Sequence, residues 1–213
     1  MSILREHPVW EVLAGTVLSP ARTFGDLDGD AHPARYGTLA LLAVSAVYTV
    51  ILAVFLLRGY PPAATSALGL SVDRQYAAQI WYQVPLFFSS TALTAAALVL
   101  IVRLAGRHVA FAVAFGRVSL GTAVPFALTT MLVEAVIAAL LAVGALRPLP
   151  TLHWLTGSGV WFATLYQSVG LVWLAALVVV AIRVSGIGRW WLSALAAVPL
   201  LVLHGLPVGL LIR

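Results

Sequence analysis

The chain has 213 residues, of which 62% are hydrophobic and only 9% are charged, and all of its basic residues are arginine. A water-soluble domain carries about a quarter charged residues, so this composition excludes a soluble globular protein. The chain has no cysteine, which excludes disulfides, thiolate metal sites and cysteine nucleophiles. The scattered arginines do not form a nucleic-acid-binding patch, and no nucleic-acid partner is expected.

Residues 1–36 are the only sizeable polar region, and they predict a cytoplasmic or interfacial amphipathic segment. Apolar residues recur there at near-helical spacing, and Trp10 suits an anchor at the membrane–water boundary. Ser19 and Pro20 predict the N-cap and first position of a second short helix. The segment lacks an apolar core of signal-peptide type, so no cleaved targeting segment is expected.

Three acids follow in alternation, Asp26, Asp28 and Asp30. Calcium loops also use alternating acids, but the EF-hand loop needs glycine at its sixth position and glutamate at its twelfth. Here Gly29 is fourth and Gly37 is twelfth. We therefore expect a solvated acidic turn, with no metal site and no cofactor.

Five apolar runs are long enough to form helices of about 20 residues, which is the length that crosses a bilayer. They predict an all-α fold, a polytopic integral membrane protein with a bundle of five transmembrane helices. The predicted spans are residues 37–57, 84–102, 118–144, 160–182 and 190–212. Residues 72–83 suggest a short interfacial helix before the second span. Residues 103–117 are expected to form a basic loop whose apolar centre lies on the membrane surface.

The distribution of arginine predicts the orientation, because arginine is enriched in cytoplasmic loops. One side of the predicted topology holds Arg5, Arg22, Arg35, Arg103, Arg107, Arg117, Arg183 and Arg189. The other side holds Arg58, Arg74, Arg147 and Arg213. The N-terminus is therefore expected in the cytoplasm and the C-terminus outside, with the plasma (inner) membrane as the location.

Glu134 is the only acid within an apolar run, and an ionisable group inside a bilayer is costly. At 1.5 Å rise per residue, Glu134 and His204 lie roughly 21–23 Å from the cytoplasmic start of their spans. Polar residues of the other spans reach a comparable level in the outer half. The candidate binding residues of this polar layer are Tyr48, Ser90, Thr94, Glu134, Gln167, Ser168 and His204.

Two interpretations of the polar layer remain open. The polar groups can hydrogen-bond one another and hold the helices together, which is common in lipid. Alternatively, they can form a transport or binding site, and a hydrogen-bonded Glu134–His204 pair is one form of it. We favour the first interpretation, because buried Ser, Thr and Gln commonly hold helices together in lipid. The sequence does not determine the rotation of each helix, so it does not show whether Glu134 and His204 meet.

A hydrolase is the sharpest catalytic alternative. The run Gly157-Ser158-Gly159 resembles part of a serine-nucleophile turn, with His204 as a conceivable base. Rhomboid-type proteases place glycine two residues before the serine, whereas this chain has Thr156 there. A flexible turn explains the run more simply, so no catalytic residue is assigned and no enzyme is expected.

The order of short motifs resembles the Yip family, the Ypt-interacting proteins. The matching pieces are Ser19-Pro20-Ala21-Arg22-Thr23-Phe24, Gly106-Arg107-His108-Val109-Ala110-Phe111, residues 121–125, Trp173 and residues 183–190. The resemblance implies a five-span membrane protein with a cytoplasmic N-terminus. The Asp-Leu-Tyr-Gly-Pro motif of eukaryotic members is absent, and the long N-terminal segment is reduced, as in a short prokaryote-like form.

The resemblance implies a non-catalytic membrane organiser or interaction partner. Its expected partners are the lipid bilayer and a membrane protein or a second copy of the chain. The alternative from the residues themselves is a small transporter, lipid-handling protein or channel that uses the polar layer around Glu134 and His204. The intramembrane hydrolase is the third possibility.

Overall fold

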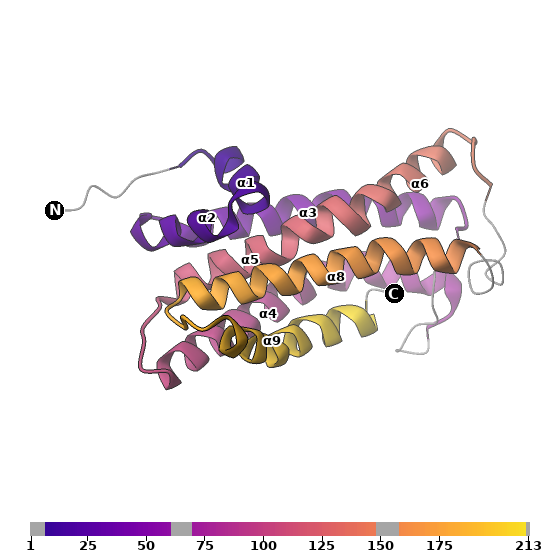
Figure 1. The fold of residues 1–213 in the computed structure, drawn as a ribbon. Helices are drawn as coiled ribbons and strands as arrows, with labels where there is room; N and C mark the ends of the chain where they lie inside the picture. The colour runs from indigo at the N-terminus through magenta and orange to yellow at the C-terminus, as the bar shows by residue number, and fades with distance from the viewer. Residues whose placement is uncertain (1–6, 61–69, 148–157, 212–213) are drawn as a thin grey trace.

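The computed structural model describes residues 7–60, 70–147 and 158–211, which form helices joined by turns. The long helices lie side by side, and the short helices of residues 9–26 lie at one end (Figure 1). The elements are α1 (Val9–Leu18), α2 (Pro20–Asp26), the short 3₁₀ helix η1 (Leu27–Gly29), α3 (Pro33–Leu57), α4 (Val72–Leu104), α5 (Phe111–Phe126), the π-helical segment η2 (Ala127–Met131), α6 (Leu132–Ala142), α8 (Ser158–Val184) and α9 (Trp190–Leu211).

Five helical stretches in the described residues are long and apolar enough to cross a membrane. They are Pro33–Leu57, Arg74–Leu104, Phe111–Ala142, Thr164–Val184 and Trp190–Val208. In the third stretch, α5, η2 and α6 follow one another without a break. The predicted all-α polytopic fold is thus confirmed.

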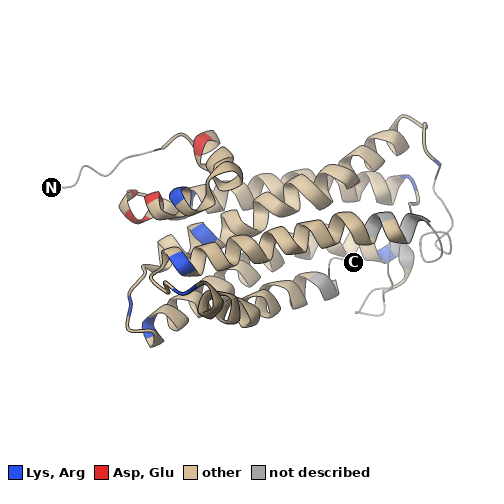
Figure 2. Ribbon diagram, in the orientation of Figure 1, with Lys and Arg blue, Asp and Glu red and all other residues tan. Residues whose placement is uncertain are grey.

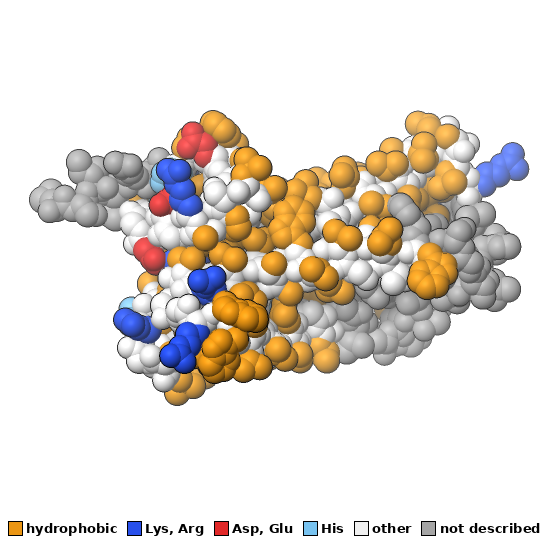
Figure 3. Space-filling model, in the orientation of Figure 1, with side chains coloured by type: hydrophobic (Ala, Val, Ile, Leu, Met, Phe, Trp, Pro, Cys, Tyr) orange, Lys and Arg blue, Asp and Glu red, His pale blue; other side chains and the backbone are white. Residues whose placement is uncertain are grey.

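Charged residues gather at the two ends of the bundle (Figure 2). We call the end that carries α1 and α2 the basic end. The order of the helices places there Arg22, Arg35, Arg103, Arg107, Arg117, Arg183 and Arg189. Hydrophobic side chains cover much of the flank between the ends (Figure 3). Trp10, Trp81, Trp161 and Trp190 are all more than two-thirds exposed. Tryptophan favours the boundary between lipid and water, so this arrangement suits a membrane.

The helix of the second span begins earlier than the predicted span, and the separate interfacial helix predicted before it is wrong. Helix α4 is continuous from Val72 to Leu104, with Pro85 inside it, so no separate interfacial helix precedes the span. Proline is tolerated within transmembrane helices, because neighbouring groups can satisfy the freed backbone carbonyl.

The predicted basic loop before the third span is also wrong in its second half. Helix α5 begins at Phe111 rather than at Val118, and Val113, Ala114 and Arg117 are buried. Helices α1 and η1 both contact α5. The first turns of α5 are therefore covered by the N-terminal segment of the chain itself, which hydropathy along the sequence does not reveal.

Helices α3 and α5 approach each other closely at two glycines. A Cβ atom on Gly116 would lie 2.5 Å from the backbone oxygen of Pro33, and one on Gly37 would lie 2.5 Å from Cβ of Ser119. Small residues at helix interfaces allow such approaches in lipid, where packing rather than the hydrophobic effect holds helices together. These two glycines therefore fix the separation of α3 and α5.

The third span widens at η2, directly after Pro125. Proline cannot donate the backbone hydrogen bond that an α-helix needs, and a π-helical turn is one response to such a break. The Thr129 hydroxyl donates to the Pro125 carbonyl over 2.7 Å. Helix α8 passes close to this point, because a Cβ on Gly170 would lie 2.4 Å from Thr129 Oγ1.

Candidate functional site

A cavity of about 150 Å³ lies beside η2 and α6. Every long helix contributes to its wall. Its polar lining residues are Tyr48, Thr122, Thr129, Thr130, Glu134, Gln167 and His204. Its other lining residues are Leu41, Val44, Phe87, Ala123, Phe126, Gly170, Leu171, Leu174, Gly205 and Val208. An apolar cavity with a few convergent polar groups is the usual form of a small-molecule site.

The cavity follows from the break in the third span and from a glycine on α9. Helix α8 contacts η2, while the continuation of the third span, α6, packs against α3. On the opposite wall Gly205 has no side chain, and a Cβ built there would meet nothing within 4 Å. Space remains between these helices because no side chain fills it.

Glu134 brings a carboxyl group to the cavity wall. Its side chain is half-buried, and the hydroxyl of Tyr48 donates a hydrogen bond to it. Tyr48 itself is 4% exposed. A carboxyl group in such an apolar setting needs hydrogen bonds, which Tyr48 supplies in part.

His204 lies on α9 and lines the same cavity, with only 6% of its surface exposed. Its Nδ1 atom has no hydrogen-bond partner in the described part of the chain. The conceivable Glu134–His204 hydrogen bond is therefore not formed through this atom. Leaving a buried polar atom without a partner costs about 1–3 kcal/mol, so a ligand that supplied one would gain binding energy.

Gln167 of α8 completes the group of predicted residues that the fold brings together. Tyr48, Glu134, Gln167 and His204 come from four different helices and face one cavity. These four residues lie at a similar depth because each residue of a helix adds a fixed rise. They face the same cavity because packing sets the rotation of each helix about its axis.

Three predicted site residues, Ser90, Thr94 and Ser168, do not line the cavity. Ser90 donates to the Phe87 carbonyl and Thr94 to the Ser90 carbonyl, both within α4. Ser168 is exposed on the flank of α8. Hydroxyl groups that bond to their own helix need no neighbour, so polarity and depth alone did not identify the wall of the cavity.

Aromatic rings form part of the wall. Phe126 packs edge-on against Tyr48, with ring centroids 5.3 Å apart, and against Phe87, at 5.5 Å. Edge-to-face pairs of this kind stabilise each other by about 0.5–1.5 kcal/mol beyond the area that they bury. The rings give the cavity a rigid apolar side.

Tyr60 follows the C-terminal end of α3 and lies near Glu134 and Tyr166. It stacks on Phe55, with ring centroids 4.8 Å apart. Burial, together with nearby Tyr166 and Glu134, raises the pKa of the Tyr60 hydroxyl above its ordinary value. This hydroxyl therefore remains a neutral hydrogen-bonding group at all physiological pH values.

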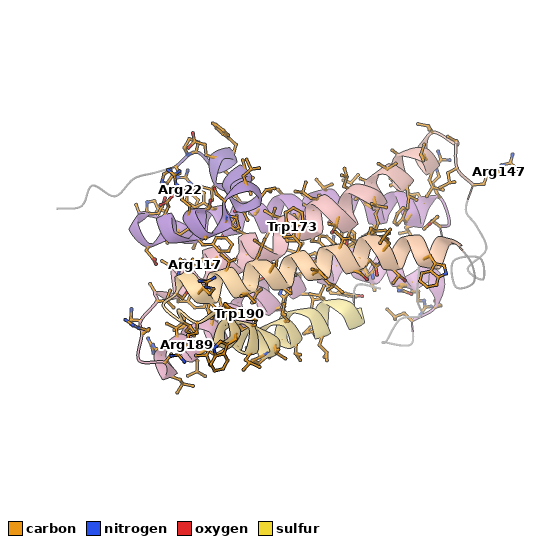
Figure 4. The ribbon with its side chains drawn as sticks, in the orientation of Figure 1. Arg22, Arg117, Arg147, Trp173, Arg189 and Trp190 are labelled. Carbon is orange, nitrogen blue, oxygen red and sulfur yellow. The ribbon has the colours of Figure 1, made fainter. Side chains whose placement is uncertain are left out.

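Arg117 lies within α5 and not in the loop predicted for residues 103–117. It is fully buried at the basic end, where α2, α5 and α8 meet (Figure 4). Its guanidinium donates to the Phe24 carbonyl over 2.7 and 2.9 Å and to Ser185 Oγ over 2.9 Å. It also forms an ion pair of 2.7 Å with Asp28.

The acidic turn is correspondingly less solvated than predicted. Asp28 pairs with Arg117, while Asp30 is 8% exposed. Asp30 accepts hydrogen bonds from the Tyr36 hydroxyl (2.8 Å) and from the backbone N–H of His32 (2.7 Å). Asp28 and Asp30 therefore attach the N-terminal segment to the bundle.

The predicted serine turn falls largely outside the described residues. Ser158 is the first residue of α8, its side chain is not described, and Gly157 lies outside the described residues. In the described parts of the chain, no group of three or more His, Asp and Glu side chains is placed to hold a metal ion.

Comparison with protein-family models, curated proteins and solved structures found no match for this chain. The resemblance to the Yip family therefore stays a prediction from short motifs. What the fold itself establishes is a helical chain with five stretches suited to span a membrane.

Proposed function

We propose that this protein is a non-catalytic integral membrane protein that binds a small amphiphilic molecule in its intramembrane cavity. Such binding is the step that a small transporter or a lipid-handling protein requires. The observation that carries the proposal is the buried Nδ1 of His204, which lacks a partner among the described residues and lines the same cavity as Glu134.

Two further features support binding over simple packing. Buried polar atoms usually have a hydrogen-bond partner, and of the buried side-chain atoms in the described residues that lack one, Nδ1 of His204 is the one whose residue lines the cavity. The cavity volume of about 150 Å³ is also much larger than the gaps of an ordinary interior. A cavity of this size accommodates a molecule about as large as benzene.

Replacing Gly205 by leucine should abolish binding without unfolding the protein. Gly205 lines the cavity, and a larger side chain has room at this position, since a built Cβ meets nothing within 4 Å. Leucine is also favoured over glycine in a helix by up to about 1 kcal/mol. The measurement is fluorine NMR of para-fluorobenzyl alcohol added to the protein in lipid nanodiscs, where saturable binding produces a shifted or broadened signal.

Val202→Leu is the matched control, because Val202 lies on the same helix and is 53% exposed. It should bind the probe as the unaltered protein does. Equal saturable binding by Gly205→Leu and the unaltered protein would show that the probe occupies another site and would overturn the proposal.

The proposed orientation places the basic end in the cytoplasm, because arginine is enriched on that side. The chain lacks cysteine, so labelling of single introduced cysteines can report the orientation in the membrane directly. Gly188 and Ala145 are exposed at opposite ends. In intact cells, a membrane-impermeant maleimide should label Ala145→Cys at once and Gly188→Cys only after permeabilisation. The reverse pattern would contradict the orientation.

An organiser or interaction partner is the second proposal, and it follows from the family resemblance. The exposed arginines of the basic end, among them Arg22 and Arg189, favour this end as the contact surface (Figure 4). An arginine-rich end suits an acidic partner or anionic lipid headgroups. This role and ligand binding use different ends of the bundle and can coexist.

A further inference from the structure

The charge of the cavity wall indicates which charge a bound ligand can carry. The described residues that line the cavity include one carboxyl group, that of Glu134, and neither an arginine nor a lysine. An acidic wall in a medium of low dielectric constant repels an anion strongly and attracts a cation. Anionic headgroups and carboxylates are therefore disfavoured.

The polar groups of the wall also suit a hydrogen-bond donor. The carboxyl group of Glu134 accepts hydrogen bonds, and so does Nδ1 of His204 when the imidazole proton is on Nε2. The hydroxyl groups of Thr129 and Thr130 lie in the same wall. A primary ammonium group carries three donors and can satisfy several acceptors at once.

The remaining surface is apolar and aromatic. The rings of Tyr48, Phe87 and Phe126 form a connected cluster in the wall. Aromatic faces attract cations through their quadrupoles, and they also pack against the hydrocarbon part of a ligand. Aromatic side chains together with an acid are thus complementary to both parts of a small organic amine.

We propose that the cavity takes a small hydrophobic amine, with its ammonium group against Glu134 and His204. Its hydrocarbon body packs on the rings of Tyr48, Phe87 and Phe126. This assignment rests on the proposed ligand-binding function and specifies its substrate class. A cavity of about 150 Å³ limits the amine to one small ring or a short alkyl chain.

Three probes of the same shape test the assignment: para-fluorobenzylamine, para-fluorobenzyl alcohol and para-fluorobenzoate. Each is titrated by fluorine NMR into the protein in nanodiscs of neutral lipid, with empty nanodiscs as the blank. The amine should bind about tenfold or more tightly than the alcohol, because a hydrogen bond between charged groups is stronger than a neutral one. The benzoate should not bind.

Glu134→Gln removes the negative charge of the site and keeps nearly the same side-chain shape. It should weaken binding of the amine by about tenfold or more and binding of the alcohol by a smaller factor, because the amine loses a hydrogen bond between two charged groups and the alcohol loses one to a single charged group. Val202→Leu serves as the folded control. If Glu134→Gln fails to fold, the affinities of the three probes for the unaltered protein still show whether the site prefers an ammonium group.

The outcomes distinguish the two proposals. Equal affinity for amine and alcohol, unaffected by Glu134→Gln but lost in Gly205→Leu, would overturn the amine assignment and leave the ligand-binding cavity in place. Absence of saturable binding for all three probes would overturn both. The amine could be a free molecule or the headgroup of an amine-bearing lipid. The lipid of phosphatidylcholine nanodiscs contains no primary amine, so binding of para-fluorobenzylamine there shows that a free amine suffices. Displacement of this probe by added phosphatidylethanolamine would show that the lipid headgroup also occupies the cavity.

Discussion

Replacing Arg117 by methionine should lower the free energy of unfolding by about 3 kcal/mol, at the low end of the range for breaking a buried ion pair because Asp28 is partly exposed. Methionine fills a similar space but supplies none of the donors that Phe24 and Ser185 accept. The measurement is unfolding by sodium dodecyl sulfate in mixed micelles, followed by tryptophan fluorescence.

A second effect of Arg117→Met should be local. Arg117 is the contact between the third span and the Phe24 carbonyl near the end of α2. Without it, α2 should separate from the bundle more often, and trypsin should cleave at exposed Arg22 faster. This result would show that the buried arginine holds the N-terminal segment in place.

Two variants serve as controls for Arg117. Arg183→Met removes an exposed arginine from the last turn of α8 and should change neither stability nor cleavage. Arg117→Lys should be intermediate, because lysine keeps the charge but lacks the planar fork that reaches several acceptors. If Arg117→Met behaves like Arg183→Met, the buried cluster does not stabilise the fold.

Replacing Gly116 by alanine should destabilise the protein by about 1–3 kcal/mol, the usual cost of overpacking a tight interface. The new Cβ would lie 2.5 Å from the Pro33 carbonyl oxygen. Because that atom belongs to the backbone, no side-chain rotation relieves the contact, and α3 and α5 have to move apart. The same unfolding measurement in mixed micelles reports the change.

Gly205→Ala is the matched control for Gly116→Ala, since it makes the same substitution in a helix where the added Cβ meets nothing within 4 Å. It should leave stability unchanged or raise it slightly, because alanine is the better helix former. Equal stability of the two variants would show that α3 and α5 are not held at this close separation.

The two substitutions concern neighbouring residues with different roles. Gly116 sets how closely α3 and α5 approach, and Arg117 attaches the N-terminal segment to α5. Further along the same span, Pro125 and η2 open the space in which the cavity lies. The third span therefore connects the anchored basic end to the part of the bundle that contains the cavity.

The sequence predicted the cavity residues in part. The level of Glu134 along its helix was predictable, since each residue adds a fixed rise. The rotation of each helix was not, and it is rotation that directs Tyr48, Gln167 and His204 inward and leaves Ser168 on the flank. Gly205 was not predicted at all, because its contribution is the absence of a side chain from a space that neighbouring helices enclose.

By itself the sequence determined the helical class and the five stretches that can span a membrane. In lipid the backbone must satisfy its own hydrogen bonds, and so a long apolar run can only be a helix. Only the tertiary structure decided that Arg117 belongs to a helix and not to a loop. Its partners Phe24, Asp28 and Ser185 lie 68 to 93 residues away along the chain. A buried charge becomes tolerable only when such distant groups converge on it, and no local pattern in the sequence records that convergence.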